Sequence, residues 1–361
     1  MYGPTHYLDW ARRFYGTVRF DLASSGIPVV PPAELGAPDP ASARDVGGWT
    51  RLREAIAGYH AVSTGEVVVA LGTTHGLWLA YAALTSPGDD VVVESPGYEP
   101  LVRIPEGMGV RVIPFERSEA EGWSLDPDRI ARAMTPRTRA VVVTNLHNPS
   151  GVRTPDDVLR SLARRIEGRG AHLLVDEVYA PFDGLVDGAG VFGGSAHRLA
   201  PGVVAVGSLT KCYGVANQRV GWLLGPAPIV ARAQHAITAS CGMLPLDHAH
   251  VGVHAFGRLP YLAARARAIL PGKRDLVARW VVSHGLAWHA PAQGLYGLVR
   301  VPGAGDLTPV IEAAAREREV LVAAGSFFGV PDGFRVAWSS PPGELDEGLG
   351  RLADALATVR R

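Results

Sequence analysis

Residues 203–224 constrain the fold of this chain more than any other stretch, because two apolar, β-branched runs enclose a polar loop there. Residues 203–206 predict a buried strand, and residues 220–224 predict a second one. The loop between the two runs carries four side chains suited to chemistry: Ser208, Thr210, Lys211 and Arg219. The pattern therefore indicates a functional site between two core strands.

Lys211 stands out against the composition, because lysine occurs only at positions 211 and 273 and every other basic side chain is Arg. Arg cannot be deprotonated in a protein, so it cannot act as an amine nucleophile. A desolvated Lys near another cation can do so, and it then forms a Schiff base with an aldehyde. Arg219 supplies such a cation and could also bind a phosphate with its planar fork. The alternative, a surface Lys in a turn, is disfavoured by the flanking strands and by the scarcity of lysine.

The composition is that of a globular protein and excludes several classes of partner. With 361 residues and 47% hydrophobic content, the chain is long enough for two domains with ample cores. Its 35 basic and 35 acidic residues balance, and no basic tract suggests nucleic acid or an anionic membrane. The start lacks the apolar core of a signal peptide, and no apolar run reaches membrane-spanning length. Because only Cys212 and Cys241 occur, we expect a reduced, cytoplasmic protein.

A Gly/hydroxyl turn follows the strand predicted at residues 67–71. Gly72, Thr73 and Thr74 precede a predicted helix at residues 76–84. Such a turn at a helix N-terminus presents free N–H groups and the positive end of the helix dipole, which suits a phosphate. The same turn is also a common helix cap.

Two further predicted strands end in turns that carry an aromatic or amide side chain. The strand at 90–94 precedes a Pro-Gly turn that offers Tyr98, which in its plainest interpretation is an aromatic residue of a loop core. The strand at 140–144 leads into N-L-H-N-P-S-G, where Asn148 is held rigid before a proline. A plain Asn-Pro turn does not require five apolar or β-branched residues before it, so the pattern favours a site.

Charged residues lie at two more positions where a ligand is expected. The apolar run at 171–175 ends in Asp176, with Tyr179 three residues on, and α/β folds place ligands at the carboxyl ends of parallel strands. A helix-capping role is the competing interpretation of Asp176. Arg335 lies in the apolar run F-R-V-A-W, and its planar fork is a natural partner for a substrate carboxylate. The apolar neighbours make a plain surface strand less favourable.

The remaining segments predict mainly helices. Residues 7–15 and 47–59 predict one helix each, and residues 226–290 predict long helices broken at Pro245 and Pro271. Histidines occur at 248, 250 and 254, the last two at the spacing of a metal pair, but no third type of ligand is near and we expect no metal. A small α+β region follows, with strands at 294–299, 320–323 and 334–338 and helices at 306–317 and 344–360.

Together these motifs resemble class I/II aminotransferases, the fold type I enzymes that use pyridoxal 5'-phosphate. S-x-x-K, with Arg eight residues after the Lys and then V-G-W, is similar to the lysine segment of that family. N-L-H-N-P-S-G is similar to the family's N-P-H-N-P-T-G, and the motifs follow the family's order over residues 47–340. The resemblance implies an α/β fold with a large domain at 46–255, built on a mostly parallel seven-stranded sheet covered by helices. It also implies a small domain formed by 1–45 and 256–361.

The resemblance assigns a role to each motif residue. Lys211 is expected to hold the cofactor as a Schiff base, Asp176 to pair with the ring nitrogen and Tyr98 to stack on the ring, and these three are the predicted catalytic residues. The predicted cofactor-binding residues are Gly72, Thr73, Thr74, Tyr98, Asn148, Asp176, Tyr179, Ser208, Lys211 and Arg219. The predicted substrate-binding residues are Gly26, Asn148 and Arg335.

The implied reaction moves the amino group of an L-amino acid to a 2-oxo acid, and the implied assembly is a homodimer. One position departs from the family's pattern. A Tyr commonly lies five residues before the second Gly of the pair at 47–48 and reaches the partner subunit's phosphate, but this chain has Ala43 there. Trp49 and Trp78 could line an apolar substrate pocket.

Two alternatives remain open at this point. The cofactor could serve another reaction, such as elimination, decarboxylation, or the cyclisation or oxidation of an arginine-like amino acid. The stretch LDWARRFYGTVRFDLASSG, residues 8–26, is similar to capreomycidine-synthase-like enzymes. The second alternative is a non-catalytic regulator that joins this fold to a DNA-binding head; the segment before residue 47 is short for such a head, and no basic patch accompanies it.

Overall fold

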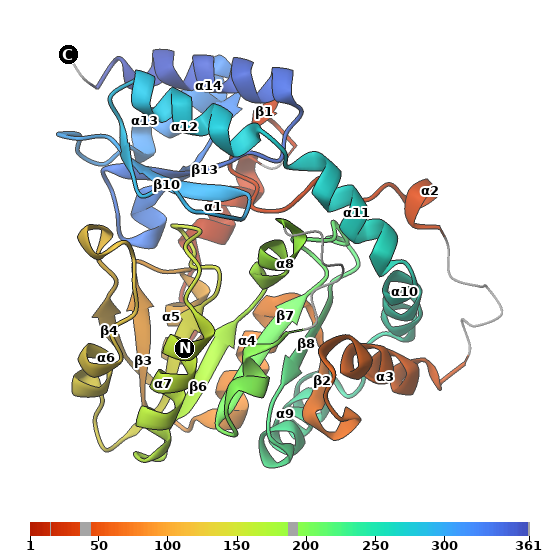
Figure 1. Cartoon of the computed structure of the whole chain (residues 1–361). Coiled ribbons are helices and arrows are strands. Elements are labelled where there is room, and N and C mark those ends of the chain that lie inside the picture. Colours follow the sequence, from red (N-terminus) through yellow and green to blue (C-terminus); the bar gives the residue numbers. More distant parts are fainter. Residues whose placement is uncertain (15, 37–44, 187–193, 360–361) are drawn as a thin grey trace.

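The computed structural model describes residues 1–14, 16–36, 45–186 and 194–359 (Figure 1). Ala43 lies outside these ranges, so the expected loss of the family's contact with the partner subunit's phosphate at that position stays a prediction. A seven-stranded sheet with helices on both faces forms one part of the molecule, and a four-stranded sheet with its own helices forms another (Figure 1). The predicted α/β fold is confirmed.

The large sheet has the strand order β2-β8-β7-β6-β5-β3-β4. Strands β7, β6, β5, β3 and β4 run parallel, whereas β8 is antiparallel to both of its neighbours. The sheet is therefore mostly parallel, as predicted. Its strands are β2 (Val67–Leu71), β3 (Asp90–Ser95), β4 (Arg111–Glu116), β5 (Thr138–Thr144), β6 (His172–Asp176), β7 (Val203–Ser208) and β8 (Val220–Leu224).

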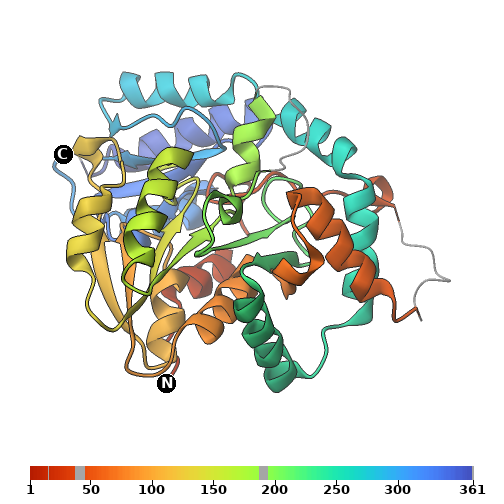
Figure 2. The same ribbon diagram turned by 60° about the horizontal axis from the view of Figure 1, so that its bottom comes forward.

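The side chains of the parallel strands divide between two cores, because successive residues of a strand point to opposite faces. Val91 and Val93 belong to one hydrophobic core, and Val92 between them belongs to the other. The first face is covered by α4 (Gly72–Leu84), α5 (Pro100–Gly107) and α9 (Ala227–Cys241), the second by α6 (Pro127–Ala133) and α7 (Asp156–Glu167) (Figure 2). Burial on both faces explains why these strands read as continuous apolar runs.

The smaller sheet has the order β12-β13-β10-β9 and is antiparallel where its register is described. A separate two-stranded pair joins the N-terminal segment to the C-terminal region, since Phe20 and Asp21 pair in parallel with Val320 and Leu321. The division into domains at residues 46 and 255 stays a prediction. The elements are β1 (Phe20–Asp21), β9 (Ala287–Trp288), β10 (Tyr296–Arg300), β11 (Val320–Leu321), β12 (Ala323–Ala324), β13 (Gly333–Ala337), α12 (Lys273–Ser283), α13 (Thr308–Arg318) and α14 (Pro342–Leu356).

The helices expected between residues 226 and 290 are α9, α10, α11 and α12. Pro245 caps the start of α10, and Pro271 precedes α12, so both prolines mark the expected breaks. The helix expected at 76–84 begins earlier, at Gly72, so the predicted phosphate turn is its first turn. The remaining helices are α1 (His6–Phe14), α2 (Pro32–Leu35), α3 (Gly48–His60), α8 (Asp183–Val186), α10 (Leu246–Gly257) and α11 (Leu259–Ile269).

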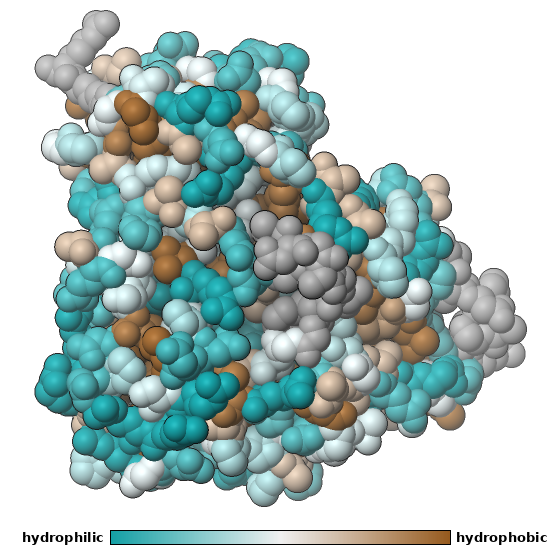
Figure 3. Space-filling view, in the orientation of Figure 1, coloured by the Kyte–Doolittle hydropathy of each residue, from teal (hydrophilic) through white to brown (hydrophobic). Residues whose placement is uncertain are grey.

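Hydrophilic residues dominate the face seen in Figure 3, and apolar residues are scattered among them rather than gathered in one patch. Within the described ranges, no helix is both long and apolar enough to cross a membrane. The apolar side chains are instead concentrated in the two cores that flank the large sheet.

Candidate active site

A cavity of about 410 Å³ lies where the parallel strands end. Its walls include Asp176 at the end of β6, Ser208 at the end of β7 and Asn148 in the turn after β5. Loops at the carboxyl ends of parallel strands are where α/β folds place ligands. Of the twelve predicted site residues, ten line this cavity, and the two exceptions are glycines: Gly26 and Gly72.

The two glycines nevertheless lie against residues of the cavity. A Cβ atom at Gly26 would be 3.4 Å from Cδ of Lys211, so the Gly26 backbone packs on the lysine side chain. A Cβ atom at Gly72 would be only 2.4 Å from Nη2 of Arg219, and Gly72 has a φ of +75°. Gly72 therefore favours glycine because the Arg219 guanidinium occupies the space and the backbone conformation adds to that preference, whereas the contact at Gly26 is an ordinary van der Waals contact.

Lys211 follows β7 and lines the cavity. Burial lowers the pKa of its ammonium from the usual 10.5 to about 8, and the positive charges of Arg335 and Arg219 act in the same direction. The carboxylate of Asp176 opposes them. The neutral amine, which is the nucleophilic and basic form, is consequently more populated near neutral pH than in an ordinary lysine.

Asp176 is a buried carboxyl group at the carboxyl end of β6. Its Oδ1 accepts a hydrogen bond from the backbone N–H of Val178 at 3.0 Å. Burial raises the pKa of Asp176 from 3.8 to about 7, and the nearby Glu94 adds to the rise. A cation placed against Asp176 would favour the ionised form, so the site suits a protonated ring nitrogen.

Hydroxyl groups and one guanidinium gather at the first turn of α4. Thr73 Oγ1 donates to Ser208 Oγ at 3.0 Å, and the N–H of Thr210 donates to the same oxygen at 3.3 Å. Thr210 Oγ1 is buried and has no hydrogen-bond partner in the part of the chain described. Arg219 borders the same cavity, with its guanidinium beside Gly72. Hydroxyls, a helix N-terminus and a cation make this corner suitable for a phosphate.

Two tyrosines, Tyr98 and Tyr179, also line the cavity. Burial raises the pKa of both Tyr98 and Tyr179, so both phenols are neutral. Tyr179 donates its hydroxyl hydrogen to Ser25 Oγ at 2.7 Å. Tyr98 and Tyr7 meet edge to face with ring centroids 6.1 Å apart. The two phenol rings and the Asn148 amide surround a space that suits a flat, hydroxylated ring.

Arg335 lies in β13 and is completely buried. Nη1 donates to Asn148 Oδ1 at 2.7 Å, and Nη2 donates to the Tyr7 hydroxyl at 2.8 Å and to the Ala23 carbonyl at 3.0 Å. These acceptors are all neutral, and Nε has no partner among the described residues. A buried cation without a carboxylate partner is costly, so the geometry suits an anionic ligand at this position.

The family resemblance implies that the N-terminal segment runs along the mouth of the site, but it singles out no residue of helix α1. Tyr7, Leu8 and Arg12 line the cavity, although residues 7–15 predicted only a short amphipathic helix. The Glu99 carboxylate accepts from the backbone N–H of His6 at 3.1 Å and of Tyr7 at 2.7 Å, which fixes the helix start. The signal for α1 is its amphipathic pattern, but that pattern does not say which core the helix covers.

Trp49 and Trp78 do not line this cavity, so the expectation for them is wrong. Trp49 stacks on His248, and Trp78 Nε1 donates to the Tyr2 hydroxyl at 2.7 Å. The expectation of an apolar pocket rested on residue type alone, and both rings lie elsewhere.

The histidines of α10 serve the fold. His248 Nε2 donates to the carbonyl of Arg219 at 3.0 Å, and His254 Nε2 donates to that of Leu35 at 2.7 Å. Among the described residues, no group of three or more His, Cys, Asp or Glu could hold a metal ion.

The fold and the cavity are those of an α/β enzyme that places one lysine amine, one buried carboxyl group and one anion-binding corner around a shared space. The model of the family described as "Aminotransferase class I and II" matches residues 41–352. The chain belongs to this family, whose members use pyridoxal 5'-phosphate.

Individual relatives differ in the reactions they are named for. The chain is 32% identical to the capreomycidine synthase of Streptomyces vinaceus over 98% of this chain and 94% of that protein. It is 31% identical to the arginine–pyruvate transaminase AruH of Pseudomonas aeruginosa over 79% of this chain and 74% of that protein. A PLP-dependent aminotransferase structure from Streptococcus suis matches with a TM-score of 0.87 at 20% identity, covering 100% of this chain and 99% of that one. Aspartate aminotransferase from Thermus thermophilus with maleate matches with a TM-score of 0.78 at 25% identity, covering 98% and 97%.

The residues present fit pyridoxal 5'-phosphate. The unpartnered Thr210 hydroxyl and the Arg219 guanidinium suit its phosphate. Asp176 suits its ring nitrogen, and Lys211 has an amine of lowered pKa for its aldehyde. Each functional group of the cofactor therefore has a matching group in one cavity.

Proposed function

We propose that this protein is an aminotransferase that moves the amino group of an L-amino acid to a 2-oxo acid, with Lys211 as the residue that binds the cofactor aldehyde. One observation carries the proposal: the buried Arg335 guanidinium, whose hydrogen-bond partners are all neutral, lines the same cavity as Lys211 and Asp176. An α-amino acid needs a cation for its carboxylate beside the group that reacts at its α-carbon.

Bound pyridoxal 5'-phosphate supplies an electron sink that stabilises negative charge at the α-carbon. In the proposed reaction, Arg335 binds the substrate carboxylate and fixes the orientation of the α-carbon. The Lys211 amine would then act as the general base that removes the α-proton and as the acid that gives it back. Asp176 keeps the ring nitrogen protonated, because a carboxylate next to that nitrogen favours its charged form.

The other predicted site residues hold the cofactor in this proposal. Thr73, Ser208 and Arg219 bind the phosphate, with backbone N–H groups from Gly72 and Thr74 at the first turn of α4. Asn148 and Tyr179 would donate hydrogen bonds to the ring oxygen, for which Tyr179 would give up its bond to Ser25, and Tyr98 would supply an aromatic face for the ring. Gly26 leaves room for the Lys211 side chain.

The test mixes purified enzyme, loaded with cofactor, with single amino acids and follows the near-visible absorbance of the cofactor. An aminotransferase changes this absorbance without releasing ammonia, and a 2-oxo acid such as pyruvate or 2-oxoglutarate restores it. Arg335→Gln should raise the amino-acid concentration needed by at least about tenfold, because a charge-assisted hydrogen bond contributes about 1.5–3 kcal/mol. Arg300→Gln is the matched control, since Arg300 lies on the neighbouring strand β10 and pairs with Asp332 instead.

A second candidate is an enzyme that uses the same cofactor to cyclise an amino acid. The match to capreomycidine synthase supports it, because that match covers 98% of this chain, whereas the match to the arginine–pyruvate transaminase covers 79%. The absorbance test separates the two candidates. A cyclase regenerates the starting absorbance with no 2-oxo acid present, and its product keeps the amino nitrogen.

The proposal includes a homodimer in the cytoplasm, with the domain division at residues 46 and 255. The family resemblance supports the dimer and the division, and the two cysteines without a disulfide support the compartment. Light scattering of the purified enzyme tests the dimer directly. A mass near 38.2 kDa, that of one chain, would count against it.

A further inference from the structure

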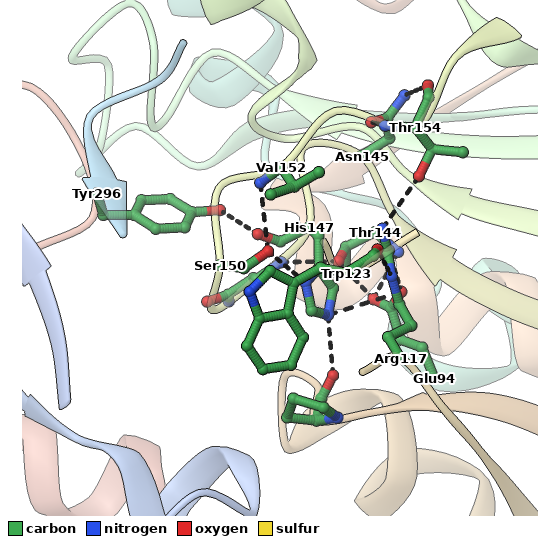
Figure 4. A network of polar contacts seen from close by, with 12 residues as sticks. Glu94, Arg117, Trp123, Thr144, Asn145, His147, Ser150, Val152, Thr154 and Tyr296 are labelled. Carbon is green, nitrogen blue, oxygen red and sulfur yellow. Dashed lines mark hydrogen bonds and ion pairs between the residues drawn. The ribbon is translucent and has the colours of Figure 1, made fainter. Parts of the chain in front are cut away.

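A fully buried ion pair lies behind the cavity, outside the set of residues that line it. Glu94 stands near the end of β3, and its Oε2 accepts from Nη1 of Arg117 at 2.9 Å, with both side chains wholly buried (Figure 4). Arg117 is also held by the Trp123 carbonyl at 2.7 Å and by Thr154 Oγ1 at 3.2 Å. Such a pair costs desolvation energy, so packing alone does not explain it.

The second oxygen of Glu94 orients Thr144, the last residue of β5. Glu94 Oε1 accepts both the backbone N–H of Thr144 at 2.7 Å and its hydroxyl hydrogen at 2.5 Å (Figure 4). A carboxylate can only accept, so the Thr144 hydroxyl must donate to it. The lone pairs of Thr144 Oγ1 are then free for another donor, and the backbone N–H of Asn148 occupies them at 2.9 Å.

Asn148 connects Thr144 with the cavity, because its backbone bonds to Thr144 and its side chain bonds to Arg335. Its Oδ1 accepts from Arg335 Nη1 at 2.7 Å, which assigns the oxygen of the carboxamide to the Arg335 side. The amide NH₂ group is the remaining polar end of the side chain, and Asn148 lines the cavity. One continuous chain of hydrogen bonds therefore runs from Arg117 through Glu94, Thr144 and Asn148 to Arg335.

A second set of contacts holds the same turn from its other side. His147 Nε2 lies 2.9 Å from the Pro96 carbonyl, so this nitrogen carries the hydrogen, and Nδ1 lies 2.6 Å from Ser150 Oγ. Burial lowers the pKa of His147 well below its usual range, so the ring is neutral and Nδ1 accepts from Ser150. These contacts fix the turn but do not reach Arg335. The path through Thr144 is the one that ends at the substrate-binding cation.

We propose that Glu94 and Thr144 are positioning residues, which set the Asn148 carboxamide so that Arg335 is held in the geometry that binds the substrate carboxylate. The inference rests on the proposed role of Arg335 in carboxylate binding. It gives the buried Glu94–Arg117 pair a function: Arg117 holds Glu94 as a fixed acceptor that leaves Thr144 only one hydroxyl orientation. Both residues act through Asn148 and contact neither substrate nor cofactor.

The test compares Thr144→Val with Thr144→Ser and with Thr138→Val. Thr138 is the matched control because it is a buried threonine at the other end of β5, where its hydroxyl accepts from the backbone N–H of Thr135 at 2.8 Å. The probe is 2-aminoisobutyrate, an amino acid without an α-hydrogen, and its dissociation constant is read from the cofactor absorbance. We expect Thr144→Val to raise this constant about tenfold, as for the loss of one hydrogen bond. Thr144→Ser and Thr138→Val should keep it within about twofold.

Glu94→Gln should act in the same direction, because its NH₂ group would face donors in either orientation of the amide: those of Arg117, or the backbone N–H and hydroxyl of Thr144. A double variant adds a readout that general destabilisation does not move: in an Asn148→Ala background, Thr144→Val should cause no further increase, since the path is already broken. Unfolding in urea, measured for every variant, separates loss of stability from loss of affinity. A crystal structure of the cofactor-loaded Thr144→Val protein should show Asn148 Oδ1 and Arg335 Nη1 moved apart beyond hydrogen-bonding distance.

The inference is overturned if Thr144→Val and Thr138→Val bind the probe equally well, or if the Asn148–Arg335 bond stays intact in the variant crystal. Failure of the proposed function looks different. A wild-type enzyme that binds 2-aminoisobutyrate but transfers no amino group from any donor contradicts the aminotransferase and leaves the binding comparison valid. If the wild-type enzyme does not bind the probe, the Asn148–Arg335 distance in the variant crystal decides whether the inference holds.

Discussion

Asn148 and Arg335 are hydrogen-bonded at 2.7 Å although 187 residues separate them in the chain. The bond joins the turn after β5 of the large sheet to β13 of the small sheet, so the two sheets meet at the cavity. Any displacement of one sheet relative to the other must therefore change the geometry of the buried guanidinium. Arg335 and Asn148, the side chains proposed to bind the substrate carboxylate and the cofactor ring, are therefore structurally coupled.

Lys211→Arg is expected to remove covalent attachment of the cofactor, because Arg cannot be deprotonated to an amine. Activity should fall by roughly 10²- to 10⁴-fold or more, the usual contribution of a general base. The control is Lys273→Arg, since Lys273 is the other lysine of the chain and donates to the Ser339 carbonyl at 3.1 Å, away from the cavity. Borohydride reduction followed by peptide mapping should label residue 211 in the wild type and in the control. Label at residue 273 would contradict the assignment.

The pKa of Lys211 should be visible in the cofactor-free protein. Burial sets it near 8, and Arg335 is the next largest cause of the lowering. Reductive methylation of Lys211, followed by mass spectrometry as a function of pH, should therefore reach half of its maximal rate near pH 8. In Arg335→Met the midpoint should move to higher pH, because a repelling positive charge is gone. A midpoint that stays in place would show that Arg335 does not act on the amine.

Most of the fold could be predicted from the sequence, because the parallel strands are buried on both faces and thus appear as uninterrupted apolar runs. The runs at 90–94, 140–144 and 171–175 correspond to the parallel strands β3, β5 and β6 within two residues. The start of α4 lies four residues before the predicted one. A glycine and two threonines have weak helix propensity, but tertiary contacts with Ser208 and Arg219 hold them in the first turn.

The candidate site residues at the strand ends could also be found, because the apolar runs show where the strands end and α/β folds place ligands at the carboxyl ends of parallel strands. The contribution of Glu94 could not, and the family resemblance places the N-terminal segment along the mouth of the site without singling out a residue of α1. Tyr7 reaches Arg335 across a separation of 328 residues, and no local pattern reports such a contact. In the sequence Glu94 is only the polar end of a strand, and the three-dimensional arrangement alone shows that Arg117 and Thr144 surround it.

Asp176 should make the stability of the cofactor-free protein depend on pH. Its pKa is about 7 in the folded state, above the usual 3.8, because of burial. Between these two values the folded protein binds its proton more tightly than the unfolded chain does, so the unfolding free energy falls as pH rises from about 4 to about 7. Asp176→Asn removes this contribution. Urea unfolding at several pH values should show the wild type losing stability relative to Asp176→Asn over this window, and a constant difference would contradict the burial argument.

Gly72→Ala should weaken cofactor binding by at least about tenfold, since a charge-assisted hydrogen bond is worth roughly 1.5–3 kcal/mol. The new methyl group would lie 2.4 Å from Arg219 Nη2 and would displace the guanidinium. Gly88→Ala is the control, because Gly88 has a φ of +90° but nothing within 4 Å of the added Cβ. Both variants carry backbone strain, and only the first disturbs the anion-binding corner. Equal cofactor affinities in equilibrium titration would show that strain alone decides the result.

Arg12 should favour a 2-oxo acid acceptor with a second carboxylate. Arg12 lines the cavity, and the ionic partner of its guanidinium is Asp9 on the same helix, at 3.6 Å with both side chains largely exposed. An exposed pair of this kind contributes little, at most about 1 kcal/mol, so a ligand carboxylate can replace Asp9 at small cost. Arg12→Gln is therefore expected to raise the KM for 2-oxoglutarate by about three- to tenfold and to change that for pyruvate by less than about twofold. Arg13→Gln is the control, because Arg13 is the next residue and pairs with Glu312 outside the cavity. If Arg12→Gln changes the KM for 2-oxoglutarate and the KM for pyruvate by the same factor, the distal carboxylate has another partner.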